Sequence, residues 1–565
     1  MKKVASVFFA VLIIACTSTA YAESLSYREV DKTLQAKVDK IFADWDKPDT
    51  PGCALAVIHN GEIVYKRGYG TANLDYNIPI TSKTAFDIGS TSKQFTAACI
   101  ALLTEEKKLS LDDDIHTYIP ELPEYESPIT IRHLLHHTSG IRDYLTLMGI
   151  AGMEAHNVYT DQDIVDLLAQ QKHLNFPPGE EHLYSNSGYV LLAVIVKRVS
   201  GISMGEYAAK HIFEPLGMKN TLVYEDRTRI IKNRSIGYSK DEKNGFRVDH
   251  FFNFDIAGDG QIYTTVEDLL FWDQSFYYPK VGGEKFNSLM LTRGTLNNGK
   301  TLDYALGLIH GKYKSLKTVS HGGAWGGFRA QMIRIPDHKC SVIVLSNLGT
   351  VSPTKLAHKV IDLYLADHIQ PEKEKKEAES TQEATATVNT AVYDAYVGKY
   401  QLEIGLMITI TKEDNRLWAK LAGQPKIELF PLSETKFDIK VVDAQLCFHR
   451  DDSGKVTKIM LRQGGQDIPG KRVEATPLTL DQMKEYVGNY YSDELLVTYK
   501  LVLEEGKLYA QVRKRPRIEL EFTEKDTCSG GRFKCVFERT EGGKIIGFSL
   551  DAGRVKNLKF KKIEE

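Results

Sequence analysis

A repeat in the last third of the chain constrains the fold more than any other feature of the sequence. Tyr396-Val-Gly-Lys-Tyr400 recurs as Tyr486-Val-Gly-Asn-Tyr490, and Leu417-Trp-Ala419 recurs as Leu508-Tyr-Ala510. Both copies alternate apolar and polar residues between glycine and aspartate turns, which is the pattern of β-strands. We therefore predict an all-β, barrel-like repeat with one copy at 392–475 and the other at 476–565. The two copies form either a single eight-stranded barrel or two separate small units.

The residues before this repeat predict a linker and a separate N-terminal domain. Residues 371–391 are rich in Glu, Lys, Ala and Thr and contain almost no large apolar side chain, as in a solvated linker. A chain of 565 residues is also too long for one ordinary hydrophobic core. We therefore expect an independent domain over residues 23–370.

The first 22 residues have the pattern of a signal peptide. Lys2-Lys3 is followed by the apolar stretch Val4–Ala15, and Ala20-Tyr21-Ala22 is a small-x-small cleavage site. This pattern predicts export to the periplasm or the extracellular space, with residues 1–22 removed. In the alternative, Ile13-Ile14-Ala15-Cys16 acts as a lipobox, and a lipid on Cys16 anchors the protein in the cell envelope. No later stretch is long and apolar enough to be predicted as a membrane span.

The net charge limits the kinds of partner that we expect, and the cysteine positions limit the possible disulfides. The formal net charge of −2 gives no basic surface of the kind that binds nucleic acid, so we expect no nucleic-acid partner. Six cysteines remain after the signal segment. Cys528 and Cys535 are spaced to face each other across a hairpin, where they either form a disulfide in an oxidising compartment or remain thiols.

The N-terminal domain has strand patterns at both ends and helix patterns between them. The expected strands are Cys53–His59, Ile63–Tyr69, Phe328–Ile335 and Ser341–Ser346. The expected helices include Ser26–Trp45, a helix running from Ser90 to near Leu109, Tyr189–Val199, Val266–Phe276 and Thr354–Asp367. Asn60-Gly61 is a strong signal for a tight hairpin between the first two strands. This order predicts an α+β domain with one antiparallel sheet, closed by strands from both ends of the domain and flanked by helices.

Ser90 and Lys93 form the pair of residues with the clearest chemical meaning. Three residues apart at the start of a helix, their side chains share one face, and the lysine can help a nearby group to take the serine proton. Ser352-Pro-Thr-Lys355 and Ser433-Glu-Thr-Lys436 have the same spacing, so this motif is not decisive alone. Its significance comes from two later motifs, Tyr184-Ser-Asn186 and His321-Gly-Gly323.

Three histidines lie close enough in sequence to suggest a metal site. His133, His136 and His137 lie on one face of an expected short helix. They lack the glutamate that accompanies the zinc ligands of such helices, so we predict that they bind no metal and are buried or hydrogen-bonded in a loop.

The order Ser90-x-x-Lys93, Tyr184-x-Asn186 and His321-Gly-Gly323 resembles the serine β-lactamase and penicillin-binding superfamily. The similarity covers about residues 26–368 and is strongest to the branch of class C β-lactamases, D,D-peptidases, D-aminopeptidases and esterases. It implies a β-lactamase/transpeptidase-like fold. The tail resembles the lipocalin-like β domains that follow such hydrolases in the D-aminopeptidase group, so the two copies could close one lipocalin-like barrel.

The resemblance also implies a role for each motif residue. Ser90 would be the nucleophile, and Lys93 would lower the cost of removing its proton. Tyr184, as a phenolate or as a proton relay through Lys93, would be the general base and would later protonate the leaving group. The substrate would be held by a supporting set of residues: Asn186, His321, Gly322 and Gly323. The backbone N–H groups of Ser90 and Ala324 would form the oxyanion hole, and no metal or organic cofactor would be needed. Considered singly, Tyr184 could instead be a packed core residue, Asn186 a helix cap and His321 a turn residue.

His321 departs from the usual pattern of the β-lactamases, which carry a lysine at this position to meet the substrate carboxylate. Because histidine is largely neutral at pH 7, this change favours peptidases, aminopeptidases or esterases. We therefore predict a serine hydrolase acting through a Ser90 acyl-enzyme on small esters, amides or D-amino-acid peptides, including fragments derived from peptidoglycan. The alternatives are a β-lactamase or D,D-carboxypeptidase, or a ligand-binding protein on the same scaffold.

Overall fold

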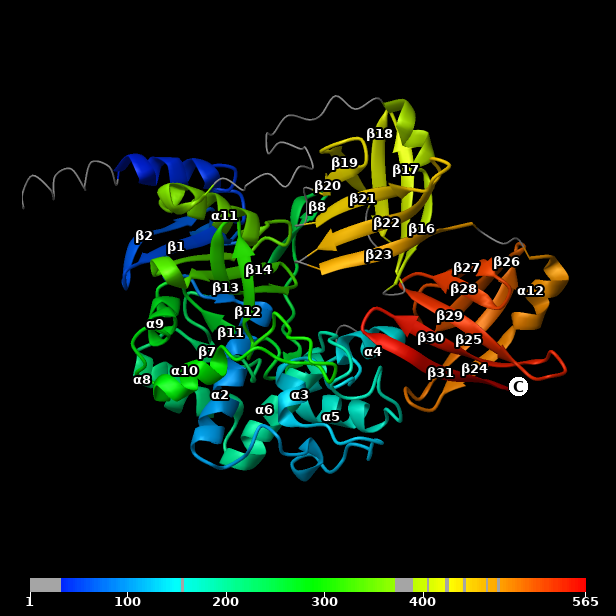
Figure 1. Ribbon diagram of the computed structural model, residues 1–565, viewed down its shortest axis with the longest axis horizontal. Coiled ribbons are helices and arrows are strands. Elements are labelled where there is room, and N and C mark those ends of the chain that lie inside the picture. The colour runs from blue at the N-terminus through cyan, green and yellow to red at the C-terminus, as the bar shows by residue number, and fades with distance from the viewer. Residues whose placement is uncertain are drawn as a thin grey trace, which may run out of the picture.

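The computed structural model describes residues 32–153, 157–370, 390–403, 406–421, 426–439, 444–463, 466–474 and 478–564. It contains an N-terminal domain and two β-barrels (Figure 1). We refer to the barrel of residues 398–473 as barrel one and to that of residues 488–563 as barrel two. The predicted signal segment with Cys16, and most of the predicted linker, lie outside the described residues.

The N-terminal domain is built around one antiparallel sheet of six strands, in the order β12-β13-β14-β15-β1-β2. From the start of the domain come β1 (Cys53–His59) and β2 (Glu62–Tyr69), and from its end come β12 (Ile309–Tyr313), β13 (Leu316–Trp325), β14 (Phe328–Ile335) and β15 (Cys340–Ser346). The pairing of β1 with β15, from Cys53–Ser346 to His59–Cys340, joins the two ends of the domain as predicted. Asn60 and Gly61 both have positive φ, as the predicted tight turn requires.

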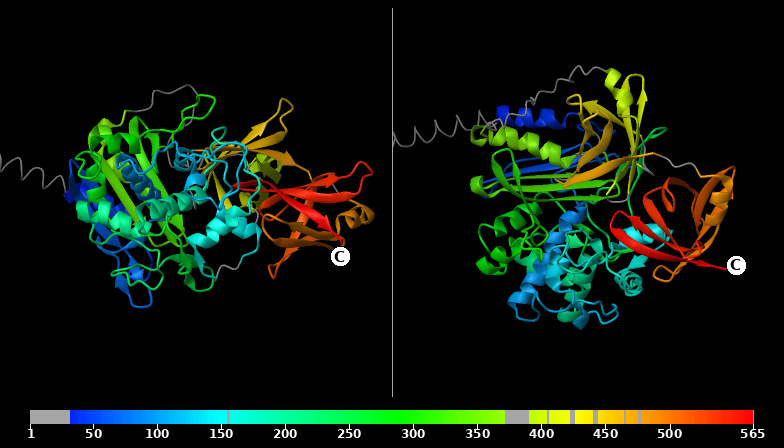
Figure 2. Two further views of the ribbon diagram at one scale, coloured as in Figure 1. Left: turned by 90° about the horizontal axis from the view of Figure 1, so that it is seen from below. Right: turned by 45° about the vertical axis from the view of Figure 1, so that its right-hand side comes forward.

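Helices cover both faces of this sheet (Figure 2). On one face, the helix over residues 32–42 and α11 (Pro353–Tyr364) pack Phe42 and Val360 against Leu55 and Val344 of the strands. The opposite face is covered by helices from the middle of the domain: α2 (Lys93–Glu105), α3 (Ile131–Leu135), α4 (Tyr144–Ile150), α5 (Asp161–Ala169), α6 (Asn186–Ser200), α7 (Met204–Ala208), α9 (Asp268–Ser275) and α10 (Gly283–Met290). β1 is therefore buried on both faces, which explains its almost continuous apolar sequence.

The predicted helices and strands agree with the structure except at their ends and at His321. The predicted helix to Leu109 ends at Glu105, and the helix predicted from Tyr189 begins at Asn186. The alternative placing His321 in a turn is wrong, because the residue lies inside β13. No single helix in the described part of the chain is long and apolar enough to cross a membrane, and the segments Asn186–Ser200 and Met204–Leu216 reach the required length only together, across a sharp bend.

Each copy of the repeat forms its own closed eight-stranded barrel, so a single barrel shared by both copies does not occur. Barrel one consists of β16 (Gly398–Leu402), β17 (Met407–Glu413), β18 (Arg416–Leu421), β19 (Ile427–Pro431), β20 (Lys436–Ile439), β21 (Ala444–Arg450), β22 (Val456–Gln463) and β23 (Gln466–Val473). Barrel two consists of β24 (Gly488–Ser492), β25 (Val497–Glu504), β26 (Lys507–Val512), β27 (Ile518–Glu524), β28 (Thr527–Gly530), β29 (Phe533–Arg539), β30 (Ile545–Ala552) and β31 (Val555–Ile563). In both barrels, strands that are consecutive in sequence are neighbours in space.

The interiors of both barrels are filled with side chains. Tyr400, Phe437 and Phe448 are buried in barrel one, and Tyr490, Phe537 and Phe548 are buried in barrel two. Cys528 and Cys535 lie directly opposite each other on β28 and β29 of barrel two, as expected for neighbouring strands, and both are present as free thiols.

Candidate active site

Ser90 lies where a strand is joined to the central helix α2. A 3-10 turn (Gly89–Ser92) leads directly into α2, so Ser90 precedes the α-helix by one turn. Gly89 adopts φ +49°, a conformation that favours glycine. The Lys93 side chain is fully buried, and its Nζ donates a hydrogen bond to Ser90 Oγ over 3.2 Å. The first predicted pair is therefore in contact.

The Lys93 ammonium makes two further hydrogen bonds, which use its remaining donors. Nζ donates to Asn186 Oδ1 at 2.9 Å and to the backbone carbonyl of Asp259 at 2.6 Å. Asn186 is the first residue of α6 and does not act as its cap, because the capping residue is Ser185 and no side chain makes a capping hydrogen bond there. The arrangement fixes Lys93 between the first two predicted motifs.

Tyr184 places its ring beside two cations. Lys93 Nζ lies 5.0 Å from the ring centroid, and the guanidinium carbon of Arg554 lies 4.8 Å from it. The Tyr184 ring also packs against His137, with a centroid separation of 4.1 Å. The Tyr184 hydroxyl is buried and makes no hydrogen bond with any part of the chain that the structure describes. It is therefore not a tyrosine anchored by its hydroxyl in the core.

His321 lies on β13 with both ring nitrogens hydrogen-bonded. Nδ1 donates to the Gly322 carbonyl at 2.7 Å, which leaves Nε2 to accept from the Tyr304 hydroxyl at 3.1 Å. Burial, together with the nearby charge of Lys93, lowers the pKa of the His321 imidazole to about 4. His321 is therefore uncharged at neutral pH.

The end of β13 lies against the turn that carries Ser90. The pairing of β12 with β13 stops at Ser320, and beyond it the Thr91 hydroxyl donates to the His321 carbonyl at 3.3 Å. A Cβ atom on Gly89 would lie 2.7 Å from the Ala324 nitrogen, and one on Gly323 would lie 1.9 Å from the Ile88 carbonyl oxygen. The two glycines thus allow the close backbone approach that the predicted oxyanion hole requires.

Ser90 opens onto a pocket with about 380 Å³ of empty space, part of it open to solvent. The predicted Lys93, Tyr184, His321, Gly322 and Gly323 are not among the residues that line it. Its lining includes the predicted Ser90, Asn186 and Ala324 together with residues not predicted from sequence: Gly89, Tyr144, Leu145, Ile256, Asp259, Gly260, Gln261 and Trp325. Asp259 lies in the glycine-bearing loop that precedes α9, so the glycines on either side of it were a usable signal. Leu145, Ile256 and Trp325 form an apolar part of the wall.

Burial raises the pKa of two acidic residues near Ser90. Burial raises the pKa of the Asp87 carboxyl to about 7, although the Gly89 N–H donates to Asp87 Oδ1 at 2.8 Å. Burial also raises the pKa of the Asp259 carboxyl, which accepts from the Tyr144 hydroxyl at 3.1 Å. Neither carboxyl accepts a hydrogen bond from Lys93, whose donors go to the Ser90 hydroxyl, the Asn186 amide oxygen and the Asp259 backbone carbonyl.

The three histidines weighed as metal ligands have separate protein partners. The Thr130 N–H donates to His133 Nδ1, and the Ser185 N–H donates to His137 Nδ1. The two ring nitrogens of His136 contact the carbonyls of Arg132 and Thr292. Within the described ranges, no three His, Cys, Asp or Glu side chains are grouped as metal ligands would be.

Two family profiles match the chain. Residues 30–365 match the family described as Beta-lactamase. Residues 382–472, which include barrel one, match a family described as Domain of unknown function (DUF3471).

Relatives extend the similarity into the barrels. The chain is 33% identical to penicillin-binding protein 4* of Bacillus subtilis (strain 168), over 75% of this chain and 95% of that protein. It is 24% identical to a D-aminopeptidase of Brucella anthropi, over 91% of this chain and 96% of that protein. Among solved structures, an octameric penicillin-binding protein homologue from Pyrococcus abyssi superimposes with a TM-score of 0.56 at 26% identity, covering 78% of this chain and 99% of that one.

Proposed function

We propose, on the premise that the chain belongs to the β-lactamase family, that it is a serine hydrolase that cleaves D-amino-acid amides or peptides through an acyl-enzyme on Ser90. The observation that supports this most directly is the meeting of two separated motifs at Lys93, while the third motif contacts the turn that carries Ser90 through the His321 carbonyl. Lys93 Nζ contacts both Ser90 Oγ and Asn186 Oδ1 and lies beside the Tyr184 ring. Metal and organic cofactors have no part in the proposed reaction.

Acylation uses Ser90, Lys93 and Tyr184. The phenolate of Tyr184 takes the Ser90 proton as Oγ forms a bond to the substrate carbonyl carbon. Lys93 stabilises the negative charge by its position beside both residues. The same proton then passes from the Tyr184 hydroxyl to the leaving nitrogen as the bond between nitrogen and carbonyl carbon breaks. The leaving group therefore departs next to Tyr184.

The backbone around Ser90 and Ala324 stabilises the oxyanion. The negative charge that develops on the carbonyl oxygen would be met by the N–H groups of these two residues, whose backbones line the same pocket. Asn186, with Gly322 and Gly323 on the strand side, supports the substrate. In deacylation, Tyr184 takes a proton from water as the water attacks the acyl carbon, and Ser90 recovers its proton as the bond to Oγ breaks.

D-Amino-acid substrates are favoured by the relatives and by the neutral state of His321. One relative is named as a D-aminopeptidase and another as a penicillin-binding protein, and both names concern D-amino-acid chemistry or its mimics. Because His321 carries no charge at neutral pH, β13 supplies no fixed cation. The apolar wall formed by Leu145, Ile256 and Trp325 suits an uncharged side chain on the acyl group. Fragments of peptidoglycan are the proposed natural source.

We place this activity outside the cytoplasm, in the periplasm or the extracellular space, because residues 1–22 have the pattern of a cleaved signal peptide. Lipidation at Cys16 is the alternative form of the same export. The consecutive antiparallel strands of each barrel support a lipocalin-like architecture, while their filled interiors argue against carriage of a ligand inside them.

The test compares Ser90→Ala with Ser352→Ala, because both serines begin a Ser-x-x-Lys segment. On a p-nitrophenyl ester and a D-amino-acid amide, Ser90→Ala is expected to lower kcat/KM by at least about 10⁴-fold. Ser352→Ala should leave the rate unchanged, since Ser352 precedes α11 and lies outside the pocket. A serine-directed fluorophosphonate should label the wild type and Ser352→Ala but not Ser90→Ala. Equal hydrolysis by Ser90→Ala and the wild type would refute the proposal.

A further inference from the structure

Among the described residues of barrel two, Arg554 is the one charged residue that lies against the ring of Tyr184, the proposed general base. It lies on the short connection between β30 and β31, and its guanidinium is 4.8 Å from the centroid of the Tyr184 ring. One guanidinium nitrogen lies 3.6 Å from Asp143 Oδ2. Asp143 is itself tied to the site, because its Oδ2 accepts a hydrogen bond from the Asn186 N–H at 2.9 Å.

The backbone of this connection is fixed, while the Arg554 side chain stays accessible. The Arg554 carbonyl accepts from Asn175 Nδ2 at 3.0 Å, and the neighbouring Lys556 N–H donates to Asn175 Oδ1 at 2.7 Å. Gly553 adopts φ +54°, which favours glycine at the turn. The Arg554 side chain nevertheless remains 42% exposed. Figure 1 shows the end of β30 and β31 beside α4, the helix that carries the pocket residue Leu145.

Lys93, the other cation beside the Tyr184 ring, and the neighbouring cations Arg142 and Lys556 have closer partners. Lys93 uses its three donors on Ser90, Asn186 and Asp259. Arg142 is buried in an ion pair with Glu494, and Lys556 is paired with Glu181 at 2.8 Å.

Arg554 differs from these cations. Its guanidinium makes no hydrogen bond to any described residue, and its nearest carboxylate, Asp143, already accepts hydrogen bonds from Asn186 and Thr146. Arg554 is thus held only by a long ion pair with Asp143 at 3.6 Å, and its N–H donors remain available to a second anionic group. A guanidinium matches the two oxygens of a carboxylate.

We infer that Arg554 binds a carboxylate on the leaving group of the substrate and so sets the substrate class of the Ser90 site. This inference rests on the proposed function, in which Tyr184 protonates the leaving nitrogen. The leaving group then stands beside Tyr184 and within reach of Arg554. The substrate class is a peptide whose released part is an amino acid with a free α-carboxylate, in preference to a simple amide or ester. Arg554 is a specificity-determining residue supplied by barrel two.

The experiment uses D-Ala-D-Ala and its C-terminal amide, with cleavage of the bond between the two residues followed by chromatography. The two substrates differ only in the charge of the leaving group. Wild type is expected to prefer the free carboxylate. Arg554→Ala should lower kcat/KM for D-Ala-D-Ala by about 10- to 100-fold and for the amide by less than about 3-fold, because one charged hydrogen-bonding partner is lost. Arg554→Lys should keep part of the preference, and Arg554→Glu should lower it further.

Arg532→Ala is the matched control. Arg532 also follows a glycine of positive φ in a turn of barrel two, is exposed, and makes no hydrogen bond or ion pair to the described residues. It should leave both rates unchanged. Equal losses by Arg554→Ala on both substrates would overturn the inference and assign Arg554 to the positioning of Tyr184. Unchanged rates on both substrates would also overturn it.

Hydrolysis of a p-nitrophenyl ester separates this inference from the proposed function. If wild type cleaves the ester in a Ser90-dependent way but shows no preference for the carboxylate over the amide, the inference fails and the serine hydrolase remains. If ester hydrolysis does not depend on Ser90, the proposed function fails and the inference falls with it.

Discussion

Barrel one and barrel two are copies of one fold with different relations to the N-terminal domain. Each has eight strands in sequence order, and corresponding tyrosines close the same internal contact, because Tyr400 donates to the Tyr396 carbonyl and Tyr490 to the Tyr486 carbonyl. The apolar core of barrel two is continuous with that of the N-terminal domain, whereas the core of barrel one is separate. Two barrels with the same internal structure can therefore make different contacts with the N-terminal domain.

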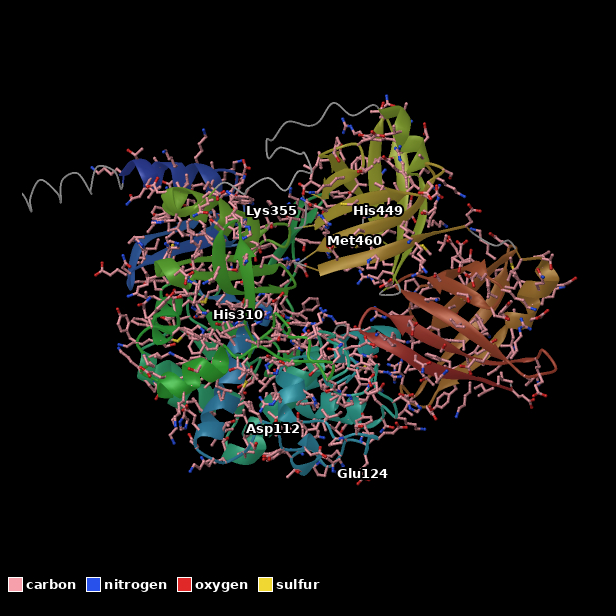
Figure 3. The ribbon with its side chains drawn as sticks, in the orientation of Figure 1. Asp112, Glu124, His310, Lys355, His449 and Met460 are labelled. Atoms are coloured by element: carbon pink, nitrogen blue, oxygen red, sulfur yellow. The ribbon has the colours of Figure 1, made fainter. Side chains whose placement is uncertain are left out.

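Two turns of barrel two account for the difference. The turn between β24 and β25 carries Glu494, which is buried against Arg142, and the turn between β30 and β31 carries Arg554. By sequence offset, barrel one has Ile404 in place of Glu494, and Gly464-Gly465 stands between β22 and β23. Barrel one instead meets the domain through the partly exposed pair Lys355–Asp438, at 3.5 Å, and Figure 3 shows Lys355 on the side of the domain that faces this barrel.

This comparison teaches that turn residues, together with the Tyr499 hydroxyl of β25 that donates to the Ile150 carbonyl, connect one copy to the helices near the active site. The interior pattern is shared, so it predicts a barrel in both places. Arg142 is adjacent to Asp143, whose carboxylate holds the Asn186 N–H and lies near Arg554. The docking of barrel two and the arrangement of the site are thus connected through two consecutive residues.

Deleting one barrel at a time should give the largest difference between the two copies, both in the free energy of unfolding and in activity. A chain ending at residue 475 loses the Arg142–Glu494 pair and the apolar contact with the domain, so we expect a loss of more than about 5 kcal/mol in the free energy of unfolding. Activity on D-Ala-D-Ala should fall by at least about 10-fold. Deletion of residues 391–475 should have a smaller effect on both quantities. Equal effects of the two deletions, in thermal unfolding and kcat/KM, would contradict the account.

The ion pairs that link each barrel to the domain should differ in strength. Glu494→Ala leaves Arg142 buried without its carboxylate, and the expected loss in the free energy of unfolding is about 3–5 kcal/mol. The counterpart Asp438→Ala removes a partly exposed partner of Lys355, and the expected loss is below about 1 kcal/mol. Urea denaturation of both variants measures this difference. A larger loss for Asp438→Ala than for Glu494→Ala would show that the docking has been assigned to the wrong barrel.

A buried carboxyl of the N-terminal domain and an exposed one of barrel one should contribute to the free energy of unfolding with opposite dependence on pH. Asp87 has a folded-state pKa of about 7, above the ordinary value of about 4, so the folded state binds more protons between these values. Its stabilising contribution is complete below about pH 4 and is lost as the pH rises to about 7, by up to about 4 kcal/mol. Asp87→Asn should flatten this slope.

The contribution of Asp451 in barrel one to the free energy of unfolding should change with pH in the opposite direction. Hydrogen bonds, the largest from the Ser453 hydroxyl, lower the pKa of the Asp451 carboxyl, so its contribution is present at neutral pH and is lost as the pH falls. Urea midpoints between pH 4 and 7 should change slope with Asp87→Asn and not with Asp451→Asn. An unchanged slope for Asp87→Asn would refute the assignment.

The smallest expected effect tests the similarity of the two barrels. Tyr400→Phe and Tyr490→Phe each remove one buried hydrogen bond to a backbone carbonyl, at 2.9 and 2.8 Å. Each substitution should cost about 1 kcal/mol in the free energy of unfolding, and the two costs should agree. A difference well above 1 kcal/mol, measured by thermal unfolding, would show that the copies differ inside as well as at their turns.

Local patterns were sufficient to predict the framework of the site. The alternating strands, the Asn60-Gly61 turn and the ordered motifs predicted a sheet closed by both ends of the domain and brought Ser90, Lys93, Asn186 and His321 to one region. Each of these signals depends on residues close in sequence, such as the three-residue spacing of Ser90 and Lys93. The strand that contains His321 was not predicted, since two glycines follow this residue and weaken the strand pattern.

The contribution of barrel two could not be predicted in this way. Arg554 is an exposed arginine in a turn, and it is more than 300 residues from Tyr184 in sequence. Its role depends on how two folded domains meet, which is set by Glu494, Asn175 and the surrounding surface rather than by a local motif. Likewise, the repeat was compatible with one barrel or with two. The alternation of apolar and polar residues indicates strands but does not give the number of strands in each copy.

The most direct test of the central claim is the intact mass of the protein after rapid mixing with a p-nitrophenyl ester and quenching in acid. The account predicts a mass increase equal to one acyl group, located by peptide mapping on the peptide that contains Ser90. Ser90→Ala should show neither the adduct nor ester hydrolysis above the uncatalysed rate. An adduct on another residue, or undiminished hydrolysis by Ser90→Ala, would contradict the claim that this chain is a Ser90 hydrolase.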